Sequence, residues 1–248
     1  YKQLFVQKDQ LQQQFENNRE SIPYFFMDEL LPKELAIQLF ESFPENHEMM
    51  HKKSIKEDKY VGFAMNKYTP ILEECIYAFQ QSKIVKLIAE ICDITNPVPD
   101  DNLYAGGLSA MANKQFLNPH LDNSHDKDRQ LWRVLNLLYY VTPGWEFDYG
   151  GNLELWPNGL QNEPISLHSK FNRLVVMATH QESLHSVSPV KHVGTRCCIS
   201  NYYFSKNPFR SSDEFHVTSF RGRPNEVVKD KILQIDNSLR MAVRKELN

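Results

Sequence analysis

Apolar residues follow a helical period in the first part of the chain. From Pro32 to Phe43 they recur every three or four residues, and a second such series runs from Ile71 up to Pro97. Residues at this spacing share one helical face, so the pattern predicts an amphipathic helix and then two more supporting helices. The short apolar run from Tyr24 to Met27 predicts a strand before them. The first twenty residues are polar and weakly patterned, which indicates a surface helix or a loosely held arm.

From Leu103 the pattern changes to short apolar runs that are separated by turn residues. These runs predict strands, which cover Val134 to Val141, Asn152 to Trp156, Arg173 to Met177 and Cys197 to Phe204. Several short strands in succession are typical of a closed or two-sheet β domain. A helical period returns from Asn225 to Glu246 and predicts a C-terminal helix.

The length of the chain fits one domain around one core, because 248 residues need not be divided between two. We expect residues 1–100 to provide mostly helical support and residues 101–206 to form the β core. Residues 207–248 would then be a C-terminal extension.

Composition narrows the possible partners. The chain has 28 Lys and Arg against 31 Asp and Glu, so its formal net charge of -3 offers no general attraction for nucleic acid or an anionic membrane. Its apolar runs are shorter than the roughly 20 residues that span a bilayer. The four cysteines form no CxxC pair, and free thiols are typical of a reducing compartment. We therefore expect a cytoplasmic protein with neither a nucleic-acid nor a membrane partner.

One group of residues suggests a metal site. His120 and Asp122 lie two positions apart, so on an extended segment their side chains emerge on one face and can share a metal ion. A third ligand must come from elsewhere, and His185 lies later, at the edge of the strand-rich region. Two histidines and one carboxylate form the facial triad of non-haem Fe(II) oxygenases, which leaves metal positions open for a co-substrate and O₂.

Arg196 opens a predicted strand after His185 and can point into the same cavity. Its planar guanidinium suits the far carboxylate of 2-oxoglutarate, which it can bind through two parallel hydrogen bonds. In the strand from Val134 to Val141, Asn136 and Tyr140 share one face. If that face is the interior, the Tyr140 hydroxyl can add a hydrogen bond to the same carboxylate.

Together these residues resemble the prolyl-4-hydroxylase-type branch of the 2-oxoglutarate/Fe(II) oxygenases. The resemblance covers roughly residues 100 to 205, because several spaced elements occur in the family order. These elements are Phe116 to Asp122, Leu135 to Tyr140, Trp145, Gly150 to Leu155, Phe171 to Leu174, His185 to Val190 and Gly194 to Arg196. The entry segment, with Asp28, Leu30 to Pro32 and Phe43-Pro44, is also similar.

The resemblance implies a mainly β fold, with a double-stranded β-helix (jelly-roll) core and helices at both ends of the chain. It implies that His120, Asp122 and His185 bind Fe(II), and that Arg196 and Tyr140 bind 2-oxoglutarate. O₂ is the other co-substrate, and ascorbate is a candidate reductant. Relatives that halogenate have Ala or Gly at the position of Asp122, so hydroxylation is favoured.

Two details of the resemblance leave alternatives. His180 competes with His185 as third ligand, but the sequence around His185 and its distance from Arg196 favour the latter. Some family members carry another co-substrate-binding tyrosine before the first histidine, where Asn113 to Leu117 offer none; Tyr104 is a candidate substitute.

The resulting hypothesis is a dioxygenase that hydroxylates an unactivated C–H bond, with a prolyl residue of a protein or peptide as the first candidate substrate. A free amino acid, a sugar or another small metabolite is the alternative, and a non-catalytic metal-binding β-fold protein is a third reading. We expect the substrate to approach near the charged loop Asn123 to Gln130 and near Trp132 or Trp145.

Overall fold

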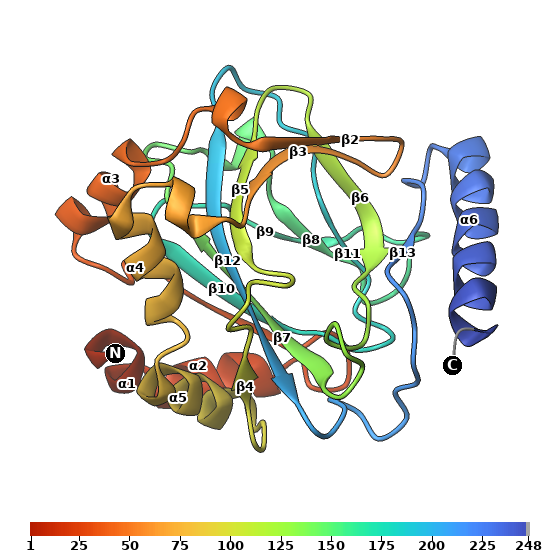
Figure 1. Ribbon diagram of the computed structural model, residues 1–248, viewed down its shortest axis with the longest axis horizontal. Helices are drawn as coiled ribbons and strands as arrows, with labels where there is room; N and C mark the ends of the chain where they lie inside the picture. The colour runs from red at the N-terminus through yellow and green to blue at the C-terminus, as the bar shows by residue number, and fades with distance from the viewer. Residues whose placement is uncertain (247–248) are drawn as a thin grey trace.

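The strands of the chain join into one antiparallel sheet that curls on itself, with helices around it (Figure 1). The computed structural model describes residues 1–246. Its α-helices are α1 (Lys2–Val6), α2 (Lys8–Glu16), α3 (Lys33–Glu41), α4 (Pro70–Ala78), α5 (Ser82–Cys92) and α6 (Val227–Glu246). Its strands are β1 (Tyr24–Met27), β2 (Met50–Lys53), β3 (Glu57–Gly62), β4 (Val98–Pro99), β5 (Gly107–Met111), β6 (Phe116–Leu121), β7 (Trp132–Tyr140), β8 (Leu153–Leu155), β9 (Ile165–Leu167), β10 (Arg173–Ala178), β11 (His185–Val187), β12 (Arg196–Ser205) and β13 (Ser219–Phe220).

The order of the strands produces a jelly roll. Along the sheet it runs β1-β10-β7-β12-β5-β3-β6-β11-β8-β9, with β13 beside β6, β2 beside β3 and β4 beside β12. Side chains from the two ends of this path pack together inside the roll. Val175 and Met177 of β10 belong to the same buried cluster as Leu153 of β8 and Leu167 of β9. The expected mainly β fold with a jelly-roll core is therefore confirmed.

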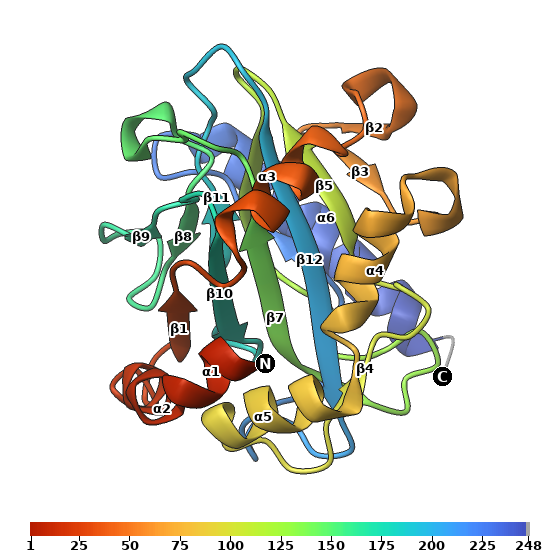
Figure 2. The same ribbon diagram turned by 90° about the vertical axis from the view of Figure 1, so that its left-hand side faces the viewer.

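Helices cover the outer face of the strands β7, β10 and β12 (Figure 2). The covered face carries Leu135, Leu137 and Tyr139, which belong to one large buried cluster with residues of α2, α4 and α5. The same view shows α6 behind the sheet, apart from the other helices. The predicted helices in 32–43 and 71–97 are confirmed as α3, α4 and α5.

The N-terminal segment is helical and packed. Leu4 in α1 and both Leu11 and Phe15 in α2 are buried against the main cluster. Of the two readings of this polar segment, the surface helix is confirmed and the loosely held arm is wrong. A few apolar residues on one helical face are enough to fix it.

Segments outside residues 101–206 also contribute strands to the sheet. β1 pairs with β10, β3 pairs with both β5 and β6, and β13 pairs with β6. The charged stretch from His47 to Lys59 carried no strand prediction, yet it forms most of the β2–β3 hairpin. Its extended conformation is stabilised by backbone pairing with neighbouring strands, which an apolar pattern does not reveal.

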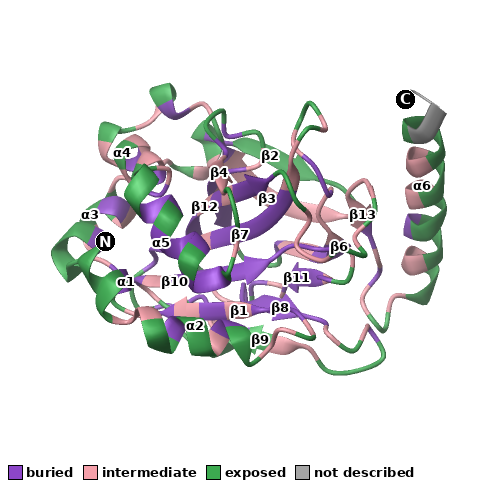
Figure 3. Cartoon of the chain, turned by 90° about the horizontal axis from the view of Figure 1, so that it is seen from below, coloured by how far each residue is buried: buried purple, intermediate pink, exposed green. Residues whose placement is uncertain are grey.

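The C-terminal helix α6 exposes much of its apolar side. Figure 3 shows mostly exposed and intermediate residues along α6. Ile232, Ile235 and Leu239 are exposed, while Leu233 is fully buried. Among the described residues, no helix is both long and apolar enough to cross a membrane.

Candidate metal centre and co-substrate pocket

Two neighbouring antiparallel strands bring the predicted metal ligands together. His120 on β6 lies directly opposite His185 on β11, and Asp122 follows the end of β6. One ligand atom of each residue lies within 4.8 Å of the others. His180 is not part of this group, and its Nδ1 accepts a hydrogen bond from the Glu182 amide at 3.2 Å.

Backbone carbonyls orient both imidazoles. The Nδ1 atom of His120 donates to the Asn118 carbonyl at 2.9 Å, and Nδ1 of His185 donates to the Ser183 carbonyl at 2.9 Å. A carbonyl only accepts, so the proton of each neutral ring is on Nδ1 and the lone pair is on Nε2. These Nε2 atoms lie 3.7 and 3.8 Å from the two oxygens of Asp122. Three donors thus face one point, as a metal ion requires.

The protonation states also suit a metal ion. Burial, with the nearby His185, lowers the pKa of His120 to about 3, and the Lys59 ammonium adds to this lowering. Burial alone would raise the pKa of Asp122, but Arg133 and the two histidines lower it to about 2. At neutral pH His120 is therefore neutral and Asp122 is ionised, which are the forms that bind metals.

Arg133 contacts the metal site, although the sequence did not indicate it. Its Nη1 lies 3.5 Å from Oδ1 of Asp122, and its guanidinium lies 4.5 Å from the centre of the Tyr202 ring. Strand alternation would place Arg133 on the helix-covered face with Leu135. The pairing of β7 with β12 is irregular at Val134, and this bulge turns Arg133 inward.

Phe220 is a second neighbour that the sequence did not indicate. Its strand β13 pairs with β6, so that Phe220 lies opposite His120. The two rings stack with centres 5.1 Å apart and an interplanar angle of 18°. The segment after residue 206 therefore fixes one imidazole, although nothing in its sequence marks it as part of the site.

Arg196 and Tyr140 lie together in the interior. Both side chains are buried, and the guanidinium of Arg196 lies 5.3 Å from the centre of the Tyr140 ring. Nη1 of Arg196 and the hydroxyl of Tyr140 have no hydrogen-bond partner within the described part of the chain. Burial raises the pKa of the Tyr140 phenol, so this group is a donor at neutral pH. Two buried donors without partners are expected to bind an anion.

The Gly150-Gly151 pair holds Arg196 in place. Gly151 has a φ of +67°, and its carbonyl accepts a hydrogen bond from Nε of Arg196 at 3.1 Å. A Cβ atom on Gly151 would lie 3.4 Å from both Cγ and Nε of Arg196. This close approach and the positive φ both favour glycine. The Gly150-Gly151 pair therefore helps to orient the guanidinium.

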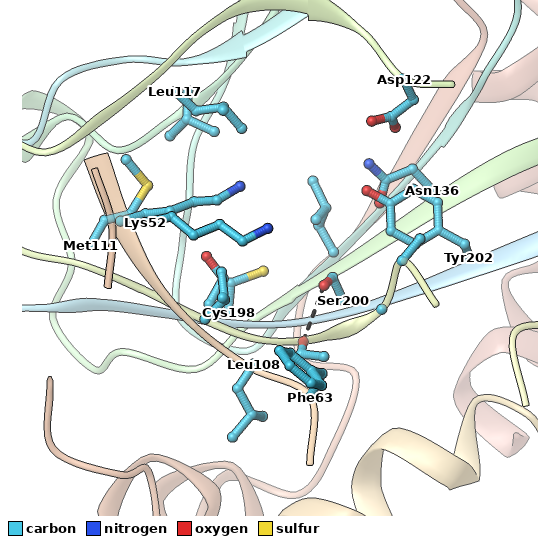
Figure 4. A pocket seen from close by; sticks show the side chains of 18 of the residues that line it. Lys52, Phe63, Leu108, Met111, Leu117, Asp122, Asn136, Cys198, Ser200 and Tyr202 are labelled. Atoms are coloured by element: carbon cyan, nitrogen blue, oxygen red, sulfur yellow. Dashed lines mark hydrogen bonds between the residues drawn. The ribbon is translucent and has the colours of Figure 1, made fainter. Parts of the chain in front are cut away.

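A cavity of about 450 Å³ is lined by the three candidate metal ligands and by Arg196. Figure 4 shows part of its lining. Asp122 and Tyr202 lie on one side of it, and Lys52, Met111 and Leu117 lie on the other. Tyr104, the candidate substitute tyrosine, also lines it and is 47% exposed.

A second cavity of about 630 Å³ lies between the loop Asn123 to Arg129 and α6, and Tyr104 lines both cavities. Tyr104 therefore lies between the charged loop and the metal cavity, and the approach of a substrate along this loop stays a prediction. Trp132 and Trp145 do not line either cavity among the described residues. Trp145 is buried, and its Nε1 donates to the Gly150 carbonyl at 2.9 Å.

Residues 106–204 match the model of the 2OG-Fe(II) oxygenase superfamily. No curated protein sequence is significantly similar to the chain. The matched segment contains the three clustered ligands, Tyr140 and Arg196.

Solved structures share the fold at low sequence identity. A prolyl-4-hydroxylase from Pseudomonas putida superposes with a TM-score of 0.57 and 16% identity, covering 79% of this chain and 98% of that one. A prolyl hydroxylase from Trichoplax adhaerens, in complex with a peptide fragment of the hypoxia inducible factor oxygen degradation domain, has the same TM-score and identity, with coverages of 82% and 92%. HygX from Streptomyces hygroscopicus, with nickel, 2-oxoglutarate and hygromycin B bound, has a TM-score of 0.50 and 10% identity, with coverages of 82% and 86%.

Proposed function

We propose that this chain, whose residues 106–204 match the model of the 2OG-Fe(II) oxygenase superfamily, is a dioxygenase that hydroxylates an unactivated C–H bond of its substrate. As a dioxygenase of this family it uses Fe(II), 2-oxoglutarate and O₂. When they are bound together, Fe(II), 2-oxoglutarate and O₂ would oxidise the substrate. The reaction converts substrate, O₂ and 2-oxoglutarate into hydroxylated substrate, succinate and CO₂. The residues of the chain position these groups and exclude water.

His120, Asp122 and His185 would hold the Fe(II). The observation that carries this assignment is the convergence of two Nε2 lone pairs and one carboxylate within 4.8 Å. Oδ2 of Asp122 is buried without a hydrogen-bond partner among the described residues, as expected of an atom whose partner is a metal ion. Because Asp122 supplies a carboxylate ligand, a halide would have no vacant position there, and hydroxylation is the proposed outcome.

Arg196 and Tyr140 would hold the far carboxylate of 2-oxoglutarate. Nη1 of Arg196 and the hydroxyl of Tyr140 have no hydrogen-bond partner among the described residues, so both can donate to one anion. Nε of Arg196 keeps its hydrogen bond to the Gly151 carbonyl. A buried charge-assisted pair of this kind orients the co-substrate as well as binding it. In this role Tyr140 donates a hydrogen bond and does not ionise.

The first candidate substrate is a prolyl residue of a protein or peptide. Support comes from the prolyl hydroxylases among the similar structures, one of them with a peptide bound. The second cavity beside the metal cavity would give an extended chain room to continue. A small metabolite is the second candidate, since HygX with hygromycin B shares the fold.

We also propose that residues 1–248 form one catalytic domain, because β1, β3 and β13 all belong to the sheet that carries the ligands. The cysteines are free, which favours a reducing compartment, and we propose the cytoplasm.

The test is turnover by the iron-loaded protein with 2-oxoglutarate, O₂ and ascorbate as reductant. Prolyl peptides and small metabolites are supplied in parallel, and succinate and a mass gain of one oxygen atom are measured. We expect one compound to gain oxygen in step with succinate release, and His120→Ala to abolish both. If no compound raises succinate above the His120→Ala background, and Arg196→Ala leaves 2-oxoglutarate binding intact, the chain is a non-catalytic metal-binding protein.

A further inference from the structure

Two lysines face each other across the β2–β3 hairpin at the edge of the metal cavity. Lys52 on β2 is paired directly with Lys59 on β3, and both side chains line the cavity. Figure 4 shows the Lys52 side chain pointing into the cavity. Like charges directly opposite each other in a sheet are destabilising. An anion between or beside the two ammonium groups would therefore stabilise this arrangement.

The protein itself only partly supplies that anion. Lys59 forms an ion pair with Glu57 at 2.9 Å, while Lys52 has no ion-pair partner among residues 1–244. Asp122 is the one carboxylate among the described residues that line the cavity. Asp122 lies closest to the two histidines and Arg133, so it offsets the charge of the lysines only in part.

The proposed cofactors do not neutralise the lysines either. The charges of Fe(II) and Arg196 balance those of Asp122 and the two carboxylates of 2-oxoglutarate. The buried Arg133 adds one further positive charge beside Asp122, so with the metal and co-substrate bound the interior keeps a net positive charge even without the hairpin. At the hairpin, Glu57 compensates one of the two ammonium groups and leaves another positive charge, so the cavity favours an anionic group on the substrate.

We propose that Lys52 and Lys59 bind a carboxylate of the substrate, so that the substrate class of this enzyme is carboxylate-bearing molecules. The inference rests on the proposed function and specifies its substrate. The carboxylate comes from a small-molecule acid or from an acidic residue or C-terminus of a peptide. Phe63 and Tyr104, which are exposed and line the same cavity, offer apolar surface to the carbon frame of the substrate.

The proposal is tested by calorimetric titration of the protein loaded with Fe(II) and saturating 2-oxoglutarate, in the absence of O₂. The probes are matched pairs: N-acetylproline with N-acetylprolinamide, N-acetylglutamate with N-acetylglutamine, and short prolyl peptides ending in a free acid or an amide. In at least one pair we expect the acid to bind roughly tenfold more tightly, the effect of one charge-assisted hydrogen bond. Whether that pair is a small molecule or a peptide distinguishes the two sources.

Lys52→Gln should reduce this preference to near unity, and Lys59→Gln should weaken it. The matched control is Lys53→Gln, because Lys53 is the next residue along the strand, does not line the cavity among the described residues, and is 72% exposed. This control should keep the full preference. Saturating 2-oxoglutarate prevents the probes from binding at Arg196.

Equal binding of acid and amide in every pair would overturn the proposal, as would a preference that survives in Lys52→Gln. Tighter binding of N-acetylphosphoserine than of any carboxylate would overturn the choice of carboxylate. The titration measures binding and requires no turnover, so it tests the lysines separately from the proposed function. A failure of the proposed function would instead appear as a compound that binds but yields no succinate.

Discussion

The buried guanidinium of Arg133 lies 3.5 Å from the carboxylate of Asp122, the one acidic group of the candidate metal centre. The two residues approach each other because a bulge at Val134 turns Arg133 inward. The guanidinium keeps the carboxylate ionised, and stacking on Tyr202 limits its own movement.

Replacing Arg133 by Met should weaken metal binding more at acidic pH than at alkaline pH. The pKa of Asp122 is depressed to about 2 in the wild type, so its carboxylate stays ionised until the pH falls through that value. Without Arg133 burial dominates and the pKa rises, so protons compete with the metal in mildly acid solution. We expect a loss of roughly 10- to 100-fold in Mn(II) affinity, measured by titration across the range from about pH 5 to about pH 8.

The control for this experiment is Arg129→Met, since Arg129 lies on the loop near Phe215 and does not pair with Asp122. Its metal affinity should follow the wild type at every pH. A uniform loss in Arg133→Met, independent of pH, would show that the guanidinium does not act through the protonation of Asp122.

Two nearby histidines should respond differently to the same substitution. His185→Gln removes a proposed ligand and should abolish detectable Fe(II) binding. His180 is buried to a similar degree but lies outside the ligand group, so His180→Gln should retain Fe(II) binding. Metal titration with thermal melting of both apo variants separates lost ligation from lost folding. Retained Fe(II) binding in His185→Gln would rule out this third ligand.

Adjacent tyrosines on β7 provide a similar contrast for the co-substrate. Tyr140→Phe removes one proposed donor to 2-oxoglutarate. The KM for 2-oxoglutarate should therefore rise about tenfold, the effect of one hydrogen bond to a charged group. Tyr139 faces the helices, where its hydroxyl donates to Asn172 at 2.7 Å. Tyr139→Phe should lower the free energy of unfolding by about 1 kcal/mol and leave this KM unchanged. Equal KM values in the two variants would count against a role for Tyr140.

Neighbouring residues of α6 should differ in their effect on stability. Leu233 is fully buried, so Leu233→Ala should lower the free energy of unfolding by about 3 kcal/mol. Ile235 is 62% exposed, so Ile235→Ala should change the free energy of unfolding by less than about 0.5 kcal/mol. Urea unfolding followed by circular dichroism measures both. A large loss in Ile235→Ala would mean that another surface covers this side of α6 in solution.

Local patterns in the sequence were sufficient for much of the fold and part of the site. Helical spacing predicted α3 to α6, and short apolar runs predicted β7, β8, β10 and β12. Alternation along β7 separated Tyr140 from Tyr139, and the two-residue spacing of His120 and Asp122 brought their side chains together. These features depend on residues a few positions apart, whose relative directions follow from backbone geometry.

Other features were decided only by the tertiary structure. Arg133 faces the metal centre because of a bulge that interrupts the alternation, and Phe220 reaches His120 through the pairing of β13 with β6. Lys52 and Lys59 line the cavity because a charged hairpin joins the sheet, and α6 turns its apolar stripe outward. Each of these contacts joins segments far apart in the chain or depends on a local break in regular pairing. Hydrophobic periodicity describes one segment at a time, so it predicts how a segment folds but not which distant segment packs against it.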